Sequence, residues 1–402
     1  TDVAGNANTD GVRTSDAYAL TVDPALRRIA NTPDTASLKA GETATLTFTF
    51  SEDVGSSFTA GDISVSGGTL GSLTQVDATH YTAVFTPTPG STANGVVSVA
   101  SGTFTDVAGN ANADGLDANN SVTLAVDTAR PTATIVVADT ALKLGETSLV
   151  TITFSEAVTG FTNADLSIAN GTLSSVSSSD GGITWTATFT PNSSVEDTTN
   201  LITLTNTGVT DLAGNAGTGS TDSNNYAIDT LRPTATIVVA DTALQLGETS
   251  LVTITFSEAV TGFTNADLTI ANGTLSSVSS ADGGRTWTAT FTPDAGIEDT
   301  TNLITLDNTG VTDAAGNAGT GTTDSNNYAI DTQRPTATIV VTDTALKAGQ
   351  GTTVTITFSE VVSGFDLSDL SVANGVLSNL ASSDGGKTWT ATLTPTAAAM
   401  TD

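Results

Sequence analysis

The chain repeats itself with a period of 102 residues, and this repetition limits what it can fold into. Trp185, Trp287 and Trp389 stand 102 residues apart, and residues 128–229 and 230–331 differ at only 12 of 102 aligned positions. A period of this length is too long for a solenoid repeat and has the size of one small domain. The sequence therefore predicts a row of near-identical domains.

Three full repeats and two partial ones account for the chain. We expect a diverged repeat over 24–127, close copies over 128–229 and 230–331, and an incomplete repeat over 332–402, whereas residues 1–23 match only the C-terminal strand of a preceding repeat. Two explanations fit the partial repeats. Either the sequence is a window from a longer chain, or its first strand completes the last repeat of a neighbouring molecule, as in donor-strand polymers.

Charge and composition exclude several classes of function. There are 42 Asp and Glu residues against 11 Lys and Arg, a net charge of -31, whereas nucleic-acid binding needs a basic surface. The absence of cysteine excludes disulfides and thiolate zinc sites. The single histidine, His80, argues against a catalytic triad or an imidazole metal site. No apolar run is long enough to cross a membrane. We therefore expect a non-enzymatic segment with no nucleic-acid partner and no membrane insertion.

Alternating apolar and polar residues predict β-strands throughout each repeat. In SLVTITF, Val150, Ile152 and Phe154 share one face and the threonines share the other. The segment GITWTATFTP alternates in the same way, and Asn170-Gly171 predicts a hairpin between two further strands. No segment shows the 3.6-residue period of a helix. About seven short strands in about 100 residues predict an all-β fold of tandem immunoglobulin-like β-sandwich modules in an elongated array.

Several recurring segments carry a resemblance to a known family, among them DTxRPTATI, FSEAV, FTNADL, TWTATFTP and DLAGNA. They resemble the bacterial Ig-like repeats of large surface adhesins and biofilm-associated proteins of the RTX type. The resemblance covers essentially the whole chain. It implies tandem Ig-like folds, secretion to the bacterial cell surface, and calcium at or near the module junctions.

The order of the strands brings recurring acidic residues to one pole of each module. In an Ig-like sandwich, the loop after the second strand and the loop before the last strand both lie where the chain enters. In residues 128–229 this places Glu156, Asp165 and Asp211 beside Asp127 of the previous module. The same argument yields three further sets, the last of them incomplete: Asp23, Glu52, Asp62 and Asp106; Asp229, Glu258, Asp267 and Asp313; Asp331, Glu360 and Asp369.

A divalent cation would relieve the repulsion within each set. At about 5 Å and an effective dielectric constant of ~20–80, each pair of carboxylates repels by roughly 1–3 kcal/mol. Donor sets made only of oxygen suit Ca²⁺, which extracellular modules bind weakly. We therefore expect Ca²⁺ as the cofactor of the junctions. In the alternative, the Asp of each DxAGN segment only orders its turn. Asn110, Asn215 and Asn317 either offer carbonyl oxygens or only shape the loop.

A second recurring motif predicts a structural hairpin. Residues 178–185, 280–287 and 382–389 fit the S-x-D-x-G-x-T-W pattern of the Asp-box found in sialidases. In this motif Asp and Gly shape the turn while Trp enters the core. A sialidase would also need a cluster of arginines, which the few basic residues of this chain do not supply.

Together these features predict a spacer region of a large bacterial adhesin, secreted to the bacterial cell surface and stiffened by calcium. Such a spacer would hold a terminal binding domain away from the cell for adhesion or biofilm formation. Two alternatives are a structural subunit of a surface fibre, sheath or S-layer-like array, and repeats that themselves bind glycans or cells. Besides calcium, the expected partners are other copies of the chain or cell-surface components.

Overall fold

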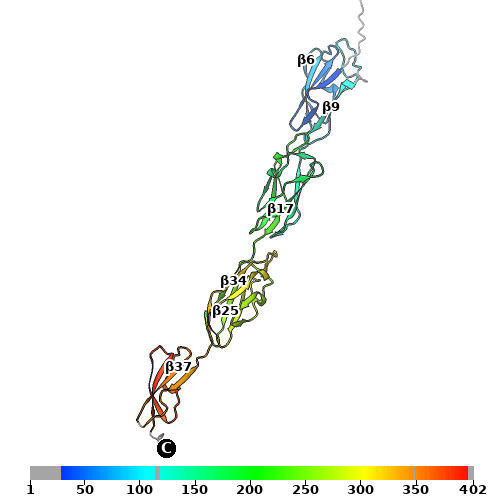
Figure 1. Ribbon diagram of the computed structural model, residues 1–402. Helices are drawn as coiled ribbons and strands as arrows, with labels where there is room; N and C mark the ends of the chain where they lie inside the picture. The colour runs from blue at the N-terminus through cyan, green and yellow to red at the C-terminus, as the bar shows by residue number, and fades with distance from the viewer. Residues whose placement is uncertain (1–28, 114–117, 348, 397–402) are drawn as a thin grey trace, which may run out of the picture. The chain divides into compact units, whose positions relative to one another are not determined.

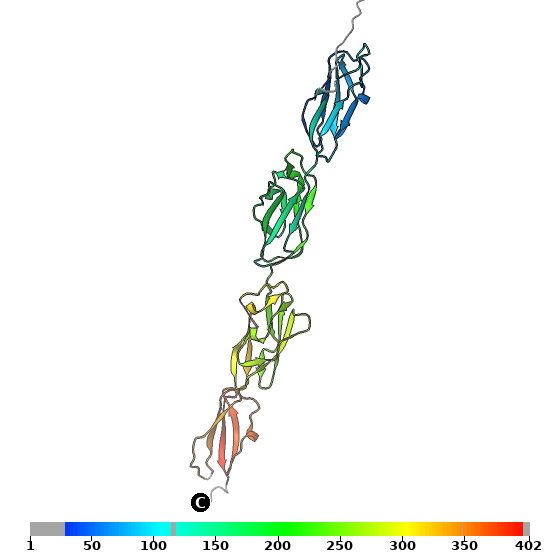
Figure 2. The ribbon, with the colours of Figure 1, turned by 90° about the vertical axis from the view of Figure 1, so that its right-hand side faces the viewer.

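The computed structural model describes residues 29–113, 118–347 and 349–396, and within them the first three repeats are built from β-sheets packed face to face (Figures 1 and 2). The chain divides between Thr230 and Leu231 into two compact units. Helices in the described part are 3-10 turns of three residues, and none is long and apolar enough to span a membrane. The expected all-β fold of tandem Ig-like modules, nearly free of helix, is confirmed.

The second repeat shows the plan. One sheet has the strand order β10-β12-β17-β15, with the short β16 also paired to β17, and all its pairs are antiparallel. Alternation along these strands buries one face and exposes the other, as the threonine-rich sequence predicts. The strands are β10 (Ala133–Val137), β12 (Ser148–Phe154), β15 (Gly171–Leu173), β16 (Ser177–Ser178) and β17 (Thr184–Pro191).

The opposite layer is made of shorter pieces. It comprises the sheets β11-β22-β18 and β14-β19-β21 and the pair β13-β20, and the β11-β22 pair is parallel. Its elements are β11 (Ala141–Lys143), β13 (Val158–Thr159), η3 (Asn163–Asp165), β14 (Leu166–Ile168), β18 (Glu196–Asn200), β19 (Ile202–Thr205), η4 (Asn206–Gly208), β20 (Thr210–Asp211), β21 (Ser220–Asp222) and β22 (Tyr226–Asp229).

The third repeat follows the same plan, the first has a single four-stranded sheet, β2-β9-β8-β4, as its second layer, and the described part of the fourth has one sheet, β36-β37-β39-β38. The first has β1 (Ile29–Pro33), β2 (Ser37–Lys39), β3 (Ala44–Phe50), η1 (Ala60–Asp62), β4 (Ile63–Ser66), β5 (Gly68–Leu70), β6 (Thr74–Asp77), β7 (His80–Pro87), β8 (Gly95–Val99), η2 (Ala118–Asn120) and β9 (Ser121–Asp127). The third has β23 (Ala235–Val239), β24 (Ala243–Gln245), β25 (Ser250–Phe256), β26 (Val260–Thr261), η5 (Asn265–Asp267), β27 (Leu268–Ile270), β28 (Gly273–Leu275), β29 (Ser279–Ser280), β30 (Thr286–Pro293), β31 (Glu298–Asn302), β32 (Ile304–Asp307), η6 (Asn308–Gly310), β33 (Thr312–Asp313), β34 (Thr322–Asp324) and β35 (Tyr328–Asp331). The fourth has β36 (Ala337–Val341), β37 (Thr352–Phe358), η7 (Leu367–Asp369), β38 (Gly375–Ser382) and β39 (Thr388–Pro395).

The core of each of the first three repeats lies between its two layers. In the second repeat Val150, Ile152 and Phe189 are fully buried, as the period-2 pattern of β12 and β17 predicts. At one end of this core, Phe161 contacts Trp185 edge to face, with ring centroids 5.2 Å apart. The tryptophan that recurs every 102 residues is therefore a packing residue of the sandwich.

The prediction of a hairpin at Asn170-Gly171 is wrong, because the strands on either side of this dipeptide belong to different sheets. Strand β14 pairs with β19, whereas β15 pairs with β17. Asn170 has a φ of 57°, and its side-chain amide donates to Asp197 and Asn200. A Cβ at Gly171 would lie 2.3 Å from the ring of Phe189. Packing against the core, and not a two-residue turn, requires this glycine.

The Asp-box segment is a structural turn, as its sequence predicts. The Asp180 carboxylate accepts hydrogen bonds from the Ser178 hydroxyl and from the backbone N–H groups of Ile183 and Thr184. The indole N–H of Trp185 donates to the carbonyl of Gly182. Because these donors favour the charged carboxylate, with the Thr184 N–H first, the pKa of Asp180 is lowered to about 2.

The low pKa makes the hairpin sensitive to acid. Since the pKa of Asp180 in the folded chain lies below the ordinary value of 3.8, the stabilisation is present above pH 3.8 and is lost as the pH falls toward about 2. Carboxyl-detected NMR should show Asp180 titrating near pH 2, together with Asp282 and Asp384, which have the same turn and the same pKa of about 2. A midpoint near 3.8 for these three residues would contradict the bonding scheme.

Tyr226 offers a test of core packing. Its side chain is fully buried, its hydroxyl has no hydrogen-bond partner among the described residues, and burial raises the pKa of Tyr226 to about 12. An unsatisfied buried hydroxyl costs about 1–3 kcal/mol. We expect Tyr226→Phe to leave the free energy of unfolding unchanged or raise it by up to that amount in chemical denaturation. Tyr226→Ala should lower it by about 3–5 kcal/mol. A loss of stability in Tyr226→Phe would show that the hydroxyl is bonded.

Candidate metal centre at a module junction

Three acidic residues meet where the first repeat joins the second. Asp127 ends β9 of the first repeat, Glu156 follows β12, and Asp211 ends β20. Carboxylate oxygens of all three lie within 4.8 Å of one another. Asp211 is only 2% exposed, and the other two are half-buried. The structure thus brings together three of the four residues that strand order predicted at this junction.

The fourth residue, Asp165, is not part of this group. It is the last residue of η3, where its carboxylate accepts from the backbone N–H of Thr162 in a capping box. The sequence argument placed it correctly in the loop after the second strand, but local capping determines where its oxygens point. Its counterparts Asp62, Asp267 and Asp369 form the same box in η1, η5 and η7.

The remaining sets are placed as follows. Asp23 lies outside the described residues, whereas Asp106 is buried and accepts from both the backbone and side-chain N–H groups of Asn110. Glu52 is half-buried in the loop after β3. These three residues belong to the set expected at the start of the first repeat.

In the later repeats the same positions recur. Asp229 ends β22 in the first unit, whereas Glu258 and Asp313 lie in the second. Asp313 is 2% exposed and accepts from the backbone and side-chain N–H groups of Asn317. Asp331 and Glu360 line one groove of the second unit.

Asn215 spans the first junction, a role that sequence reasoning left open. Its backbone N–H and its side-chain amide donate to the two oxygens of Asp211, at 2.8 and 2.7 Å. The same amide donates to the carbonyl of Asp127, and its Oδ1 accepts from the backbone N–H of Ala40 in the first repeat, at 2.7 Å. Asn215 therefore uses its side chain to hold its own loop and to tie the two repeats together.

Arg130 makes a further hydrogen bond at the junction, between the linker and the second repeat, which the sequence analysis did not predict. This linker residue donates from its guanidinium to the carbonyl of Ala216, directly after the DLAGN loop, at 2.6 Å. Arg232 makes the same bond to Ala318 in the third repeat. The signal was present in the sequence, because arginine recurs at the same place in each RPTATI segment. The linker is therefore fixed onto the module that follows it.

The electrostatics of the cluster follow from burial and like charge. Burial, first, and then the charges of Asp211 and Asp127 raise the pKa of Glu156 above its usual value. No basic side chain is among the groups responsible for this shift. The carboxylates are thus held close together at an energetic cost that a cation would remove.

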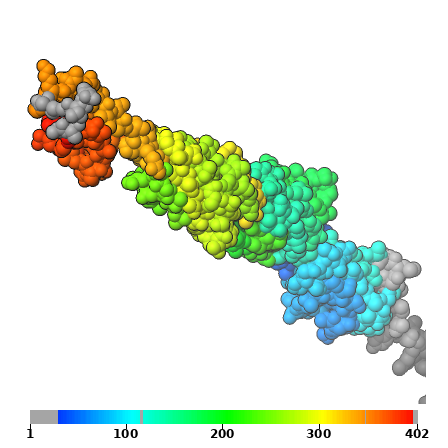
Figure 3. Space-filling view, turned by 90° about the horizontal axis from the view of Figure 1, so that it is seen from below, coloured from blue at the N-terminus to red at the C-terminus, as the bar shows by residue number. Residues whose placement is uncertain are grey.

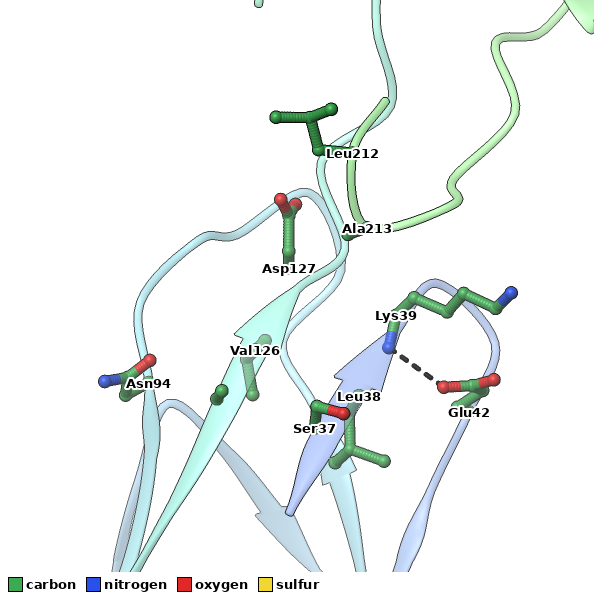
Figure 4. Close-up of a pocket in the computed structure, with 10 residues that line it drawn as sticks. Ser37, Leu38, Lys39, Glu42, Asn94, Val126, Asp127, Leu212 and Ala213 are labelled. Carbon is green, nitrogen blue, oxygen red and sulfur yellow. Dashed lines mark hydrogen bonds between the residues drawn. The ribbon is translucent and has the colours of Figure 1, made fainter. Parts of the chain in front are cut away.

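A groove of about 520 Å³ borders the cluster. Asp127 lies at the end of β9 beside Leu212 and Ala213 of the next repeat, while the Lys39 backbone N–H donates to Glu42 below them (Figure 4). Figure 3 shows the surface of the first repeat, blue to cyan, beside the green surface of the second, and the bonds of Asn215 join these two repeats. Oxygen donors from two repeats, two of them half-buried and one buried, form an arrangement able to hold a hard cation.

Solved structures that resemble this chain include bacterial adhesins and a tandem of titin domains. The Escherichia coli adhesin FdeC shares 14% identity, over 65% of this chain and 88% of that chain, with a TM-score of 0.25. Invasin, described as a bacterial integrin-binding protein, shares 15% identity over 92% and 74%, with a TM-score of 0.28. The I9-I11 tandem of titin shares 9% identity over 76% and 98%, also at 0.28. At these identities and TM-scores, the likenesses carry no conclusion about function. No curated protein matches the chain.

The bacterial Ig-like domain family matches four successive segments, residues 28–126, 127–228, 229–330 and 331–402. These segments follow the 102-residue period and together extend from residue 28 to the end of the sequence. The chain therefore belongs to the bacterial Ig-like domain family, as a tandem of four matching segments.

Proposed function

We propose that the chain is a non-enzymatic spacer region of a large bacterial surface adhesin of the RTX type, stiffened by calcium at its module junctions. It would be secreted to the cell surface and would hold a terminal binding domain away from the cell, in adhesion or biofilm formation. The observation that carries the proposal is the meeting of Asp127 from one repeat with Glu156 and Asp211 from the next. A cation held by all three would join the two modules.

The donor set fits calcium. All three groups are carboxylates, which are hard oxygen ligands of the kind Ca²⁺ prefers, and no nitrogen or sulfur ligand competes within the set. Both oxygens of Asp211 already accept from Asn215, which orients this carboxylate as an outer-shell partner orients a metal ligand. Bound calcium would supply positive charge that removes the mutual repulsion of the cluster.

Calcium would bind at a junction that hydrogen bonds already hold together. Asn215 bonds to Ala40 and Asp127 across the boundary, and Arg130 fixes the linker to the second repeat. The repulsion of the three carboxylates opposes these bonds in the absence of a cation. We therefore expect calcium to stiffen a preformed junction and not to create a new one.

The recurring acidic residues outside the cluster support a structural role. Asp180 orders the Asp-box hairpin, and Asp165 caps η3. Each of these carboxylates accepts hydrogen bonds from the backbone of its own turn. Such residues suit a structural repeat, because the length of a spacer changes with the number of repeats.

Calcium should bind and stabilise the full chain. With a dissociation constant of about 0.1–1 mM, 10 mM Ca²⁺ should add about 1–3 kcal/mol to the modules that bind it. Differential scanning calorimetry should show a higher melting temperature in calcium than in chelator. Small-angle scattering should show a stiffer particle. An unchanged melting curve and scattering profile would overturn the proposal.

Glu156→Gln separates a calcium site from a capping turn. Removing this charge relieves repulsion, so in chelator the variant should be at least as stable as the parent chain, whereas calorimetric titration should find one Ca²⁺ fewer per chain. Because the pKa of Glu156 is raised, lowering the pH from 7 toward 5 should weaken calcium binding by the parent chain. Glu196→Gln, at an exposed glutamate on β18, is the control and should keep the full stoichiometry.

Asn215→Ala should loosen the first junction even in chelator. The sequence has no cysteine, so the exposed positions Gln75 and Ser179 can be changed to Cys and labelled with nitroxides in the two repeats. We expect a single narrow distance distribution in the parent chain and a broad one in the variant. Loss of these bonds from buried groups should also cost about 1–3 kcal/mol of stability.

Asn110→Ala is the matched control for that measurement, because Asn110 makes the equivalent bonds to Asp106 in the first repeat. It should leave the distance distribution between Gln75→Cys and Ser179→Cys unchanged. Equal broadening in both variants would show that Asn215 acts through general destabilisation and not as a tie between repeats.

A further inference from the structure

We propose that the second and third repeats each carry an uncharged interaction face, and that the partner of this face is the same face of a second copy of this chain. The face is the outward side of the sheet formed by β10, β12, β15, β16 and β17 in the second repeat, and of the sheet formed by β23, β25, β28, β29 and β30 in the third. We call it the threonine face. It is independent of the acidic junctions and of calcium.

The threonine face stands out because it has no charge. None of the residues of β10, β12, β15, β16 and β17 is charged, and the same holds for the corresponding strands of the third and fourth repeats. The opposite layer of the second repeat is acidic, with Glu196, Asp197, Asp211, Asp222 and Asp229 against Lys143. A solvated sheet face ordinarily carries charges that prevent association.

The outward residues form regular rows. One row crosses four strands through Val136, Thr151, Thr186 and Ser177, which pair in register. The next row pairs Leu149 with Thr188. Val136 and Leu149 are each 53% exposed, as are their counterparts Val238 and Leu251 in the third repeat. The face thus offers methyl groups and hydroxyls in a repeating pattern, without long flexible side chains that would lose entropy on contact.

The net negative charge of the chain determines which of its surfaces a second copy can approach. A net charge of -31 makes two copies repel wherever their acidic surfaces approach. The threonine face is where two copies can meet without bringing like charges together. Two such faces can pack at the roughly 10 Å separation of sheets in a sandwich, with hydroxyls of one pairing with hydroxyls of the other.

The repetition of the face strengthens this choice. The second and third repeats present the same outward residues with a period of 102 residues, and another copy of the chain has the same period. Weak contacts between single repeats would then add along the chain through a high effective concentration. A neutral polysaccharide is the alternative occupant, but the outward positions of β12 and β17 hold threonine and leucine and no aromatic ring on which a sugar could stack.

Sedimentation equilibrium of the full chain tests the proposal, in chelator so that calcium plays no part. We expect association that depends on protein concentration and becomes stronger as NaCl is raised from 50 to 500 mM, because salt screens the repulsion between the acidic surfaces. Association through ion pairs would weaken under the same change. A chain that stays monomeric at all concentrations and salt levels would overturn the proposal.

Two double variants locate the contact. Thr188→Asp with Thr290→Asp places one charge on the threonine face of the second and third repeats, and should weaken association at least tenfold at 500 mM NaCl. Thr198→Asp with Thr300→Asp adds the same charges at exposed positions of β18 and β31, on the opposite layer, and should leave the dissociation constant within about twofold at that salt concentration.

A third double variant tests whether the loss of association could instead come from misfolding. Leu149→Ser with Leu251→Ser removes exposed apolar groups without adding charge and should weaken association severalfold while the melting temperature stays within a few degrees. Equal weakening by the two charge variants would show that net charge alone controls association. Binding of a monomeric chain to dextran, abolished by Thr188→Asp with Thr290→Asp, would assign the face to a glycan. Either result would overturn the proposal.

Discussion

The buried pair of Asp211 and Asn215 is the contact on which the arrangement of the first junction depends. A carboxylate that is 2% exposed is tolerated only when donors satisfy it, and Asn215 supplies two of them. Satisfying Asp211 folds the DLAGN loop and brings the asparagine side chain to the boundary. There it bonds to Ala40 and Asp127 of the preceding repeat. The place of Asp211 in the acidic cluster and the side-chain contact between the two repeats depend on this interaction, whereas Arg130 fixes the linker.

Charge is distributed unevenly over the second and third modules, and this gives their surfaces different properties. The pole that receives the linker concentrates carboxylates and raises the pKa of Glu156. One layer of the sandwich is acidic, while the other exposes threonine, valine and leucine. An acidic pole favours cations, and an uncharged sheet permits contact with another neutral surface. A spacer with these two features would respond to divalent ions along its length and to other copies of itself from the side.

The strands and the core were predictable from the sequence because alternation in β12 and β17 reports directly on which side of a sheet a residue lies. The convergence of Asp127, Glu156 and Asp211 was also predictable, since it depends only on strand order. Asn170-Gly171 was misread because the same dipeptide serves a tight hairpin and a crossing between sheets. The contact between Gly171 and the Phe189 ring, which distinguishes the two, joins residues distant in sequence. Asp165 lies outside the cluster because its carboxylate takes part in the capping box with Thr162 at the start of η3.

From the sequence alone follow the 102-residue period, the all-β character of each module and the presence of acidic residues near each linker. These features are local or depend on chain order, so residue type and spacing are enough to establish them. The hydrogen-bond partner of each polar side chain was decided only by the tertiary structure. Only the packed sandwich assigns Asn215 to the preceding repeat, Arg130 to the following loop and Asp165 to its own turn. The separation of charge between the two layers likewise appears only once strands far apart in sequence are placed in the same sheet.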